Sequence, residues 1–108
     1  MPAKYDRNKV CELKHVHPWF RKELEKRWPH VYIYKPPAGM YGRKGAHDFL
    51  FCIDGKFFSV ELKAPKGVMT PAQKSTYKVV KEAGGFTECV AGKEDYSVFD
   101  RIESWLKG

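Results

Sequence analysis

Apolar residues recur at helical spacing in two segments of the chain. In the first, Phe20, Leu24 and Trp28 follow one another at four-residue intervals, a pattern typical of an amphipathic helix. Pro18 suits the first turn of that helix, and Pro29 ends it. The second segment predicts a C-terminal amphipathic helix, whose apolar positions are Val98, Phe99, Ile102, Trp105 and Leu106.

Between these two helices, short apolar runs predict strands. The runs at 47–53 (HDFLFCI) and 56–63 (KFFSVELK) flank Asp54-Gly55, a dipeptide typical of a two-residue turn. Together they predict a β-hairpin, and two further short strands are predicted at 31–35 and 86–91. We therefore expect the middle of the chain to form a β-sheet.

A further helix is predicted after the hairpin. Thr70 and Gln73 have the spacing of a capping box, Pro71 suits the first helical position, and two glycines after Ala83 end the helix. A loop rich in proline and glycine occupies 36–45, so the order of elements is α-β-β-β-α-β-α. This order predicts an α+β or α/β fold in which helices flank a mixed β-sheet.

Length and composition are those of one folded domain. The chain has 108 residues, of which 43% are hydrophobic and 15% aromatic, which predicts a single domain over 1–108. Residues 1–16 are expected to form a basic N-terminal arm or a short helix that makes contact through Val10 and Leu13. No apolar run approaches the ~20 residues that span a bilayer, so we expect a cytoplasmic, intracellular protein.

The three cysteines, Cys11, Cys52 and Cys89, are scattered and lack metal-binding spacing. We expect reduced and mostly buried thiols. Cys11 together with His15 and His17 is a candidate transition-metal site, but Pro18 interrupts the helix there, which argues against zinc.

Positive charge is concentrated in the first part of the chain. Residues 1–47 contain 11 basic and 4 acidic residues, a net charge of +7, whereas 48–108 contain 9 of each. A basic surface of this kind attracts polyanions by releasing their counterions, which makes nucleic acid the leading partner. The alternative, that the lysines only solvate the surface, stays open on charge alone.

The hairpin brings two carboxylates together. With a two-residue turn at Asp54-Gly55, Asp48 lies opposite Glu61, and directly opposed Cβ atoms are ~4.5 to 5.5 Å apart. The alternation of side chains places Lys63 on the same face as Glu61, while Phe58, Val60 and Leu62 point into the core. Two facing carboxylates repel each other, and a bound Mg²⁺ or Mn²⁺ ion would offset that repulsion.

A structural explanation of the same residues stays open. Asp48 and Glu61 would then be solvent-facing edge residues, with Lys63 neutralising one of them. The basic arm before them and the lysine-rich helix after them favour phosphodiester chemistry instead. In such chemistry a carboxylate-held cation activates water and polarises phosphate, and a neighbouring lysine stabilises the charge of the transition state.

Four short motifs follow one another between residues 31 and 98: Gly45-Ala46-His47-Asp48, Glu61-Leu62-Lys63-Ala64-Pro65, Thr70-Pro71-Ala72-Gln73 and Ala83-Gly84-Gly85-Phe86. This ordered set resembles the PD-(D/E)xK nuclease superfamily, and within it the small VRR-NUC type nucleases of phages and repair enzymes. The resemblance implies a restriction-endonuclease-like core, with Asp48 and Glu61 as metal ligands and Lys63 as the active-site lysine. It also implies a role near the site for Gln73, which the capping box explains equally well.

The family also supplies an acid from its first helix. Glu12, Glu23 and Glu25 are candidates, and Glu23 is preferred because it lies beside Leu24 on the side expected to face the core. Lys35 resembles a family lysine and is expected to contact phosphate. His47 stands where the family usually has proline, so it is either a substrate contact or without a role.

The remaining basic candidates are expected to contact nucleic acid. Arg43 and Lys44 lie in the loop beside the proposed site. Lys74 and Lys78, with Lys81, form one helical stripe that either tracks a phosphate backbone or is merely solvated.

The sequence thus predicts an endonuclease or exonuclease that depends on Mg²⁺ or Mn²⁺ and needs no small-molecule cofactor. DNA is the favoured substrate, and so small a domain leaves recognition of nucleic-acid structure more plausible than base readout. The resemblance adds a homodimer. The alternatives are a non-catalytic basic nucleic-acid-binding module and an adaptor for an acidic protein.

Overall fold

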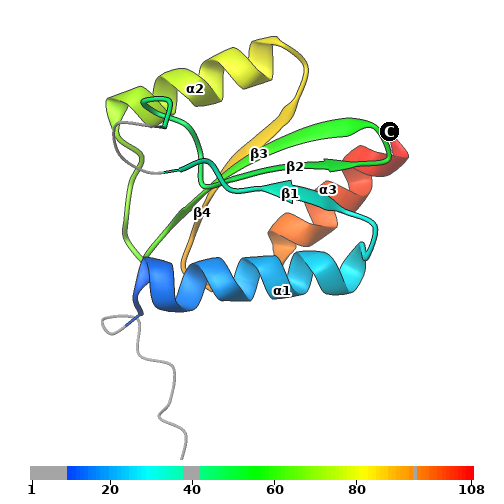
Figure 1. Ribbon diagram of the computed structural model, residues 1–108, viewed down its shortest axis with the longest axis horizontal. Coiled ribbons are helices and arrows are strands. Elements are labelled where there is room, and N and C mark those ends of the chain that lie inside the picture. The colour runs from blue at the N-terminus through cyan, green and yellow to red at the C-terminus, as the bar shows by residue number, and fades with distance from the viewer. Residues whose placement is uncertain (1–9, 38–41, 94) are drawn as a thin grey trace, which may run out of the picture.

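The structure is a computed structural model that describes residues 10–37, 42–93 and 95–108. It has an α+β fold in which helices flank a four-stranded mixed sheet, in the predicted order (Figure 1). Within the described ranges, no helix is long and apolar enough to cross a membrane. The elements are a π-helical turn η2 (Glu12–Val16), α1 (His17–Arg27), β1 (Tyr32–Tyr34), β2 (Phe49–Ile53), β3 (Lys56–Lys63), α2 (Pro71–Glu82), β4 (Phe86–Ala91) and α3 (Ser97–Lys107).

The strands lie in the order β1-β2-β3-β4. Strand β2 pairs antiparallel with both β1 and β3, whereas β4 runs parallel to β3. The predicted hairpin register is confirmed, because Ile53 pairs with Lys56 across the turn. Asp54 and Gly55 have φ angles of 51° and 80°, the left-handed conformation that a type I′ turn requires at both positions.

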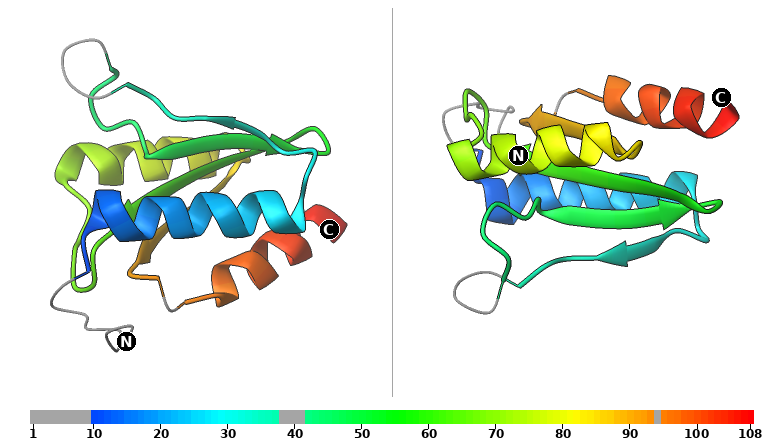
Figure 2. Two further views of the ribbon diagram at one scale, coloured as in Figure 1. Left: turned by 60° about the horizontal axis from the view of Figure 1, so that its bottom comes forward. Right: turned by 90° about the horizontal axis from the view of Figure 1, so that it is seen from above.

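Helices α1 and α3 cover one face of the sheet, and α2 covers the other (Figure 2). Strand β3 directs Phe58, Val60 and Leu62 into the core, as predicted. Its alternate residues Ser59 and Glu61 are also buried, because the opposite face of β3 is covered as well. The other members of the core are Val16, Phe20, Leu24, Phe49, Phe51, Ile53, Phe86, Val90, Val98, Phe99 and Ile102.

Pro18 lies just after the junction between η2 and α1, and the chain passes it without leaving the helix. In an α-helix the proline ring collides with the carbonyl group four residues earlier, and proline has no N–H to donate to that carbonyl. The wider π register avoids that arrangement, since the His17 N–H donates to the Glu12 carbonyl, five residues earlier. The first helical segment therefore runs from Glu12 to Arg27 with one turn of altered register.

One of the two apolar contacts expected before α1 is wrong. Leu13 is 69% exposed, and Val16 takes its place in the core, because the π turn shifts which residues face the sheet. Val10 does pack against the core, and residues 1–9 of the predicted arm lie outside the described residues.

The cysteines are free, as expected, but they are not mostly buried. Cys11 and Cys52 are exposed and Cys89 is half-buried. Cys52 lies between Phe51 and Ile53, whose side chains fill the core, so the alternation of the strand turns the thiol to the other face.

Gly45 fixes the loop before β2 against α2. Its φ is +82°, and an added Cβ would lie 2.5 Å from the Ala72 carbonyl oxygen. Gly55 has a similar φ of +80°, but no atom lies within 4 Å of an added Cβ there. The two glycines therefore separate the cost of backbone strain from the cost of a steric clash.

We expect Gly55→Ala to lower the free energy of unfolding by about 1 kcal/mol, the cost of a left-handed alanine. Gly45→Ala adds the clash with Ala72 and should cost about 2 to 4 kcal/mol in total. Urea denaturation of both variants measures the difference. Equal losses would show that the loop is not pressed against α2.

Candidate functional site

The predicted carboxylate pair forms at the open end of the hairpin, opposite the Asp54-Gly55 turn. The Asp48 N–H donates to Glu61 Oε1 over 3.2 Å, and the Leu62 N–H donates to Asp48 Oδ2 over 2.9 Å. Lys63 Nζ lies 3.2 Å from Glu61 Oε2. Each carboxylate is thus held by a backbone N–H from the opposite side of the hairpin. The structure brings Asp48, Glu61 and Lys63 together as the register predicts.

Glu61 is buried, with only 1% of its surface exposed. Burial, and then the charge of Asp48, raise its pKa from 4.5 to about 7, although the Lys63 ammonium acts in the opposite direction. The interpretation of Glu61 as a solvent-facing edge residue is therefore wrong. Its carboxylate is under strong pressure to bind a proton or a cation.

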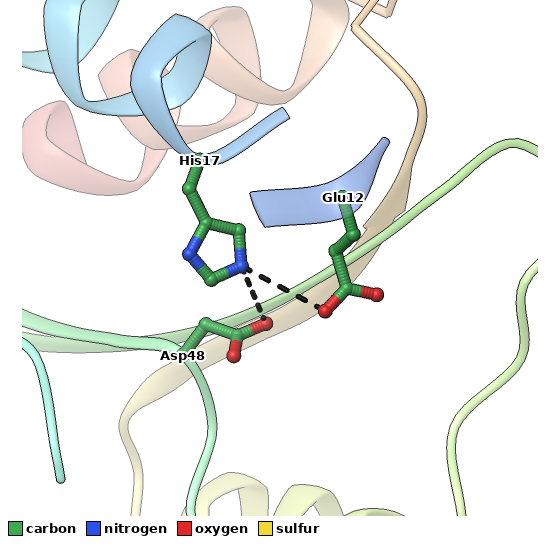
Figure 3. Close-up of side chains that lie close together, drawn as sticks. All are labelled: Glu12, His17 and Asp48. Carbon is green, nitrogen blue, oxygen red and sulfur yellow. Dashed lines mark ion pairs between the residues drawn. The ribbon is translucent and has the colours of Figure 1, made fainter. Parts of the chain in front are cut away.

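A histidine and a second glutamate complete the cluster at the start of the first helix (Figure 3). His17 Nε2 lies 3.4 Å from Asp48 Oδ2 and 3.8 Å from Glu12 Oε2. One donor atom from each of Glu12, His17 and Asp48 lies within 4.8 Å of the other two. The π register makes this possible, because it places residue 12 one turn before residue 17.

Lys35 also reaches this cluster, from the end of β1. Its Nζ lies 2.9 Å from His17 Nδ1 and 5.0 Å from the centre of the Phe49 ring. An ammonium group can only donate, so Nδ1 is the acceptor. Burial lowers the pKa of His17 and the charge of Lys35 adds to this, against the opposing charges of Asp48 and Glu12, and the net lowering favours the neutral imidazole.

Glu12, and not the preferred Glu23, is the acid that the first helix brings beside Asp48. Glu23 forms an ion pair with Arg27 at 2.8 Å, and Arg27 lies over the Phe99 ring of α3. Leu24, which neighbours Glu23, is buried as expected, but it is the first turn of the helical segment that lies beside Asp48.

His47 has a structural role that the sequence did not predict. The ring is 1% exposed; its Nε2–H donates to the Gln73 carbonyl over 3.0 Å, and the Ser59 hydroxyl donates to Nδ1 over 2.8 Å. These bonds tie the residue before Asp48 to both β3 and α2. The His47 ring therefore holds the residue before Asp48 in place between β3 and α2.

Gln73 is committed to the N-terminal cap of α2. Its Oε1 accepts a hydrogen bond from the Thr70 N–H, and its own N–H donates to Thr70 Oγ1, which confirms the predicted capping box. The structure therefore does not bring its amide to the carboxylates. Its contribution to the site is the carbonyl that holds His47.

Apart from Lys35, the basic residues predicted to contact nucleic acid fall into two places. Arg43 and Lys44 are exposed and line an open hollow of about 250 Å³ that also reaches Asp48. Lys74 and Lys78 are exposed on α2. The hollow gives the carboxylate cluster a basic border.

No protein-family model matches the chain, and comparisons with curated proteins and with solved structures likewise found no match. The carboxylates of Glu12 and Asp48 and the imidazole of His17 are a donor set that suits a divalent cation, and the buried Glu61 carboxylate lies beside Asp48.

We expect Glu61→Gln to change how stability depends on pH in the presence of EDTA. The folded state holds the Glu61 proton up to pH about 7, while the unfolded state loses it near 4.5. Folding therefore binds a proton between these values, and the wild type loses up to about 3 kcal/mol as the pH rises through this window.

The glutamine variant does not titrate, so it should gain stability relative to the wild type between pH 4.5 and 7.5. Urea denaturation at several pH values measures this difference. Glu82→Gln, at an exposed site on α2, is the matched control and should show no such trend. A difference for Glu61→Gln that stays constant with pH would contradict the expectation.

Proposed function

We propose that the protein is a divalent-metal-dependent nuclease of the PD-(D/E)xK type that hydrolyses phosphodiester bonds in DNA. One observation carries the proposal: Asp48, Glu61 and Lys63 meet at the hairpin end, beside a hollow bordered by Arg43 and Lys44. An acidic cluster within a basic border suits a substrate that is itself a polyanion.

Asp48 and Glu61 are the residues that would hold Mg²⁺ or Mn²⁺, and Glu12 lies close enough to add a third carboxylate. When bound, the cation supplies activation of water and polarisation of a phosphate oxygen. The buried Glu61 supports this assignment, because a cation offsets the cost of its negative charge.

Lys63 acts beside the carboxylates. Its side chain is 14% exposed, and its ammonium lies 3.2 Å from Glu61, so it stays close to the reacting phosphate without being free in solvent. From there it orients the attacking water or stabilises the negative charge that develops on the phosphate. Lys35 holds the opposite side of the cluster through His17.

Arg43 and Lys44 bind the substrate backbone in this proposal. Both are exposed on the loop that leads to Asp48, and phosphate contacts of this kind carry no information about base sequence. We therefore expect selection by nucleic-acid structure, such as a branch. The homodimer implied by the resemblance belongs to the same proposal, and sedimentation with a four-way junction tests it.

Asp48→Asn should lower cleavage of labelled DNA by at least about a hundredfold in Mn²⁺ or Mg²⁺, because it removes a metal-binding charge. Asp54→Asn is the matched control: Asp54 lies in the hairpin turn, and asparagine suits its left-handed φ of 51°. A panel of single-stranded, duplex and four-way-junction DNA, with RNA, identifies the substrate, and EDTA should stop the reaction.

Equal activity of Asp48→Asn and wild type would exclude the assigned site. Tight binding that depends on salt, with no cleavage of any substrate in either metal, would identify the non-catalytic binding module instead. Failure to bind any nucleic acid would leave the adaptor for an acidic protein.

The double variant Arg43→Gln/Lys44→Gln should weaken DNA binding in EDTA. It should also reduce the slope of log K against log salt concentration by about 2, one unit for each lost phosphate contact. The matched control, Lys26→Gln/Lys107→Gln, removes the same charge from the C-terminal ends of α1 and α3, which lie away from the loop before β2 (Figure 1). Equal effects of both doubles would mean that net charge, and not this hollow, binds DNA.

A further inference from the structure

His17 offers a buried nitrogen that points at two carboxylates. The residue is 5% exposed, and its Nε2 makes no hydrogen bond that meets normal geometry with any residue the structure describes. It faces Asp48 Oδ2 at 3.4 Å and Glu12 Oε2 at 3.8 Å (Figure 3). A buried polar atom without a partner is costly, so an arrangement of this kind needs an explanation.

We propose that Glu12, His17 and Asp48 form a mixed nitrogen and oxygen site that prefers a first-row transition-metal ion to Mg²⁺. The inference deepens the proposed function and rests on it only in placing the ion beside Asp48 and Glu61. Metal binding by these three residues can be measured whether or not the protein cleaves DNA.

The ligand types carry the preference. Mg²⁺ favours oxygen ligands and retains several of its waters, whereas imidazole nitrogen suits transition metals. The carboxylates of Glu12 and Asp48 alone would not discriminate strongly between Mg²⁺ and Mn²⁺. The Nε2 atom of His17 is the ligand that discriminates between the two ions. It is buried and has no hydrogen-bond partner among the described residues that would compete with a metal.

The fold holds the three donor atoms close to the spacing that one ion needs. Ligand bonds of roughly 2.0 to 2.2 Å place donor atoms within roughly 4.4 Å of one another. The three atoms already lie within 4.8 Å. The hydrogen bond from the Leu62 N–H fixes the Asp48 carboxylate. The π-helical hydrogen bond from the His17 N–H to the Glu12 carbonyl, five residues earlier, fixes the backbone of the other two residues.

Lys35 has a definite place in this arrangement. Because its ammonium donates to Nδ1, the neutral ring carries its proton on Nε2 before an ion binds. Coordination through Nε2 requires the proton on Nδ1, so the ring changes tautomer with no net loss of protons. Nδ1–H and the Lys35 ammonium are both donors, so Lys35 must turn away and becomes available to another acceptor.

The test is pulsed electron paramagnetic resonance of Mn²⁺ bound to the full chain, purified without a histidine tag. Coupling between Mn²⁺ and an imidazole nitrogen is the expected result. The chain has four histidines, and the variant His15→Gln/His30→Gln leaves only His17 and His47. His47 is buried with both nitrogens hydrogen-bonded, so coupling that persists in this variant comes from His17.

His17→Gln should abolish the coupling and weaken Mn²⁺ binding by about tenfold or more in calorimetry, with a smaller effect on Mg²⁺. His30→Gln, which removes an exposed histidine 3.0 Å from Asp54, is the matched control and should change neither. If His17→Gln does not fold, the wild type and the double variant still decide the question.

Mn²⁺ bound without nitrogen coupling in the wild type, or coupling that disappears in the double variant, would overturn the inference. Equal losses of Mn²⁺ and Mg²⁺ affinity in a folded His17→Gln variant would also do so. Nitrogen coupling without cleavage would support the metal site and contradict the proposed nuclease function. Cleavage that depends on Asp48, with no nitrogen coupling, would support the nuclease function and contradict the metal site.

Discussion

The main constraint on the structure is the burial of the Glu61 carboxylate beside a second carboxylate, that of Asp48. Strand β3 is covered on both faces, so Glu61 is removed from water at a position where an apolar residue would cost nothing. The Asp48 N–H and the Lys63 ammonium offset part of that cost. The part of the cost that is not offset raises the pKa of Glu61, so this carboxylate favours binding of a proton or a cation.

The surrounding elements keep these carboxylates in place. His47 links the loop before Asp48 to β3 and α2, and Gly45 lets the same loop approach α2 closely. On the other side of the sheet, the π turn carries the helix past Pro18 and turns Glu12 towards Asp48. A local departure from α-helical geometry thus serves two needs, tolerance of a proline and the position of an acid.

Local signals were sufficient to predict most of the fold. Asp54-Gly55 determines the turn and therefore the register, which in turn predicts that Asp48 and Glu61 meet. The capping box at Thr70 likewise places the start of α2. The turn and the cap each depend on residues only a few positions apart, so both can be predicted from local sequence.

The parts that could not be predicted depend on contacts between distant elements. Glu23 was preferred over Glu12 because it lies beside Leu24 on the side expected to face the core, and no local pattern in the sequence marks the π turn that brings Glu12 to Asp48. The sequence offers His17 only as a candidate metal ligand with Cys11 and His15, and His47 only as the residue that replaces the family's usual proline. Their roles follow from which end of α1 meets the hairpin and from how α2 packs on the sheet, and neither is encoded in local spacing.

The distribution of charge links the metal and the proposed substrate. Without a cation, the carboxylates of Glu12, Asp48 and Glu61 repel a phosphate group, even with Lys35 and Lys63 beside them. A bound divalent cation would reverse the sign of the potential at the centre of the cluster, and the basic border formed by Arg43 and Lys44 would attract the phosphates of a nucleic acid with or without it. Metal binding and phosphate binding at the cluster would therefore favour each other, because each would reduce the charge that the other must face.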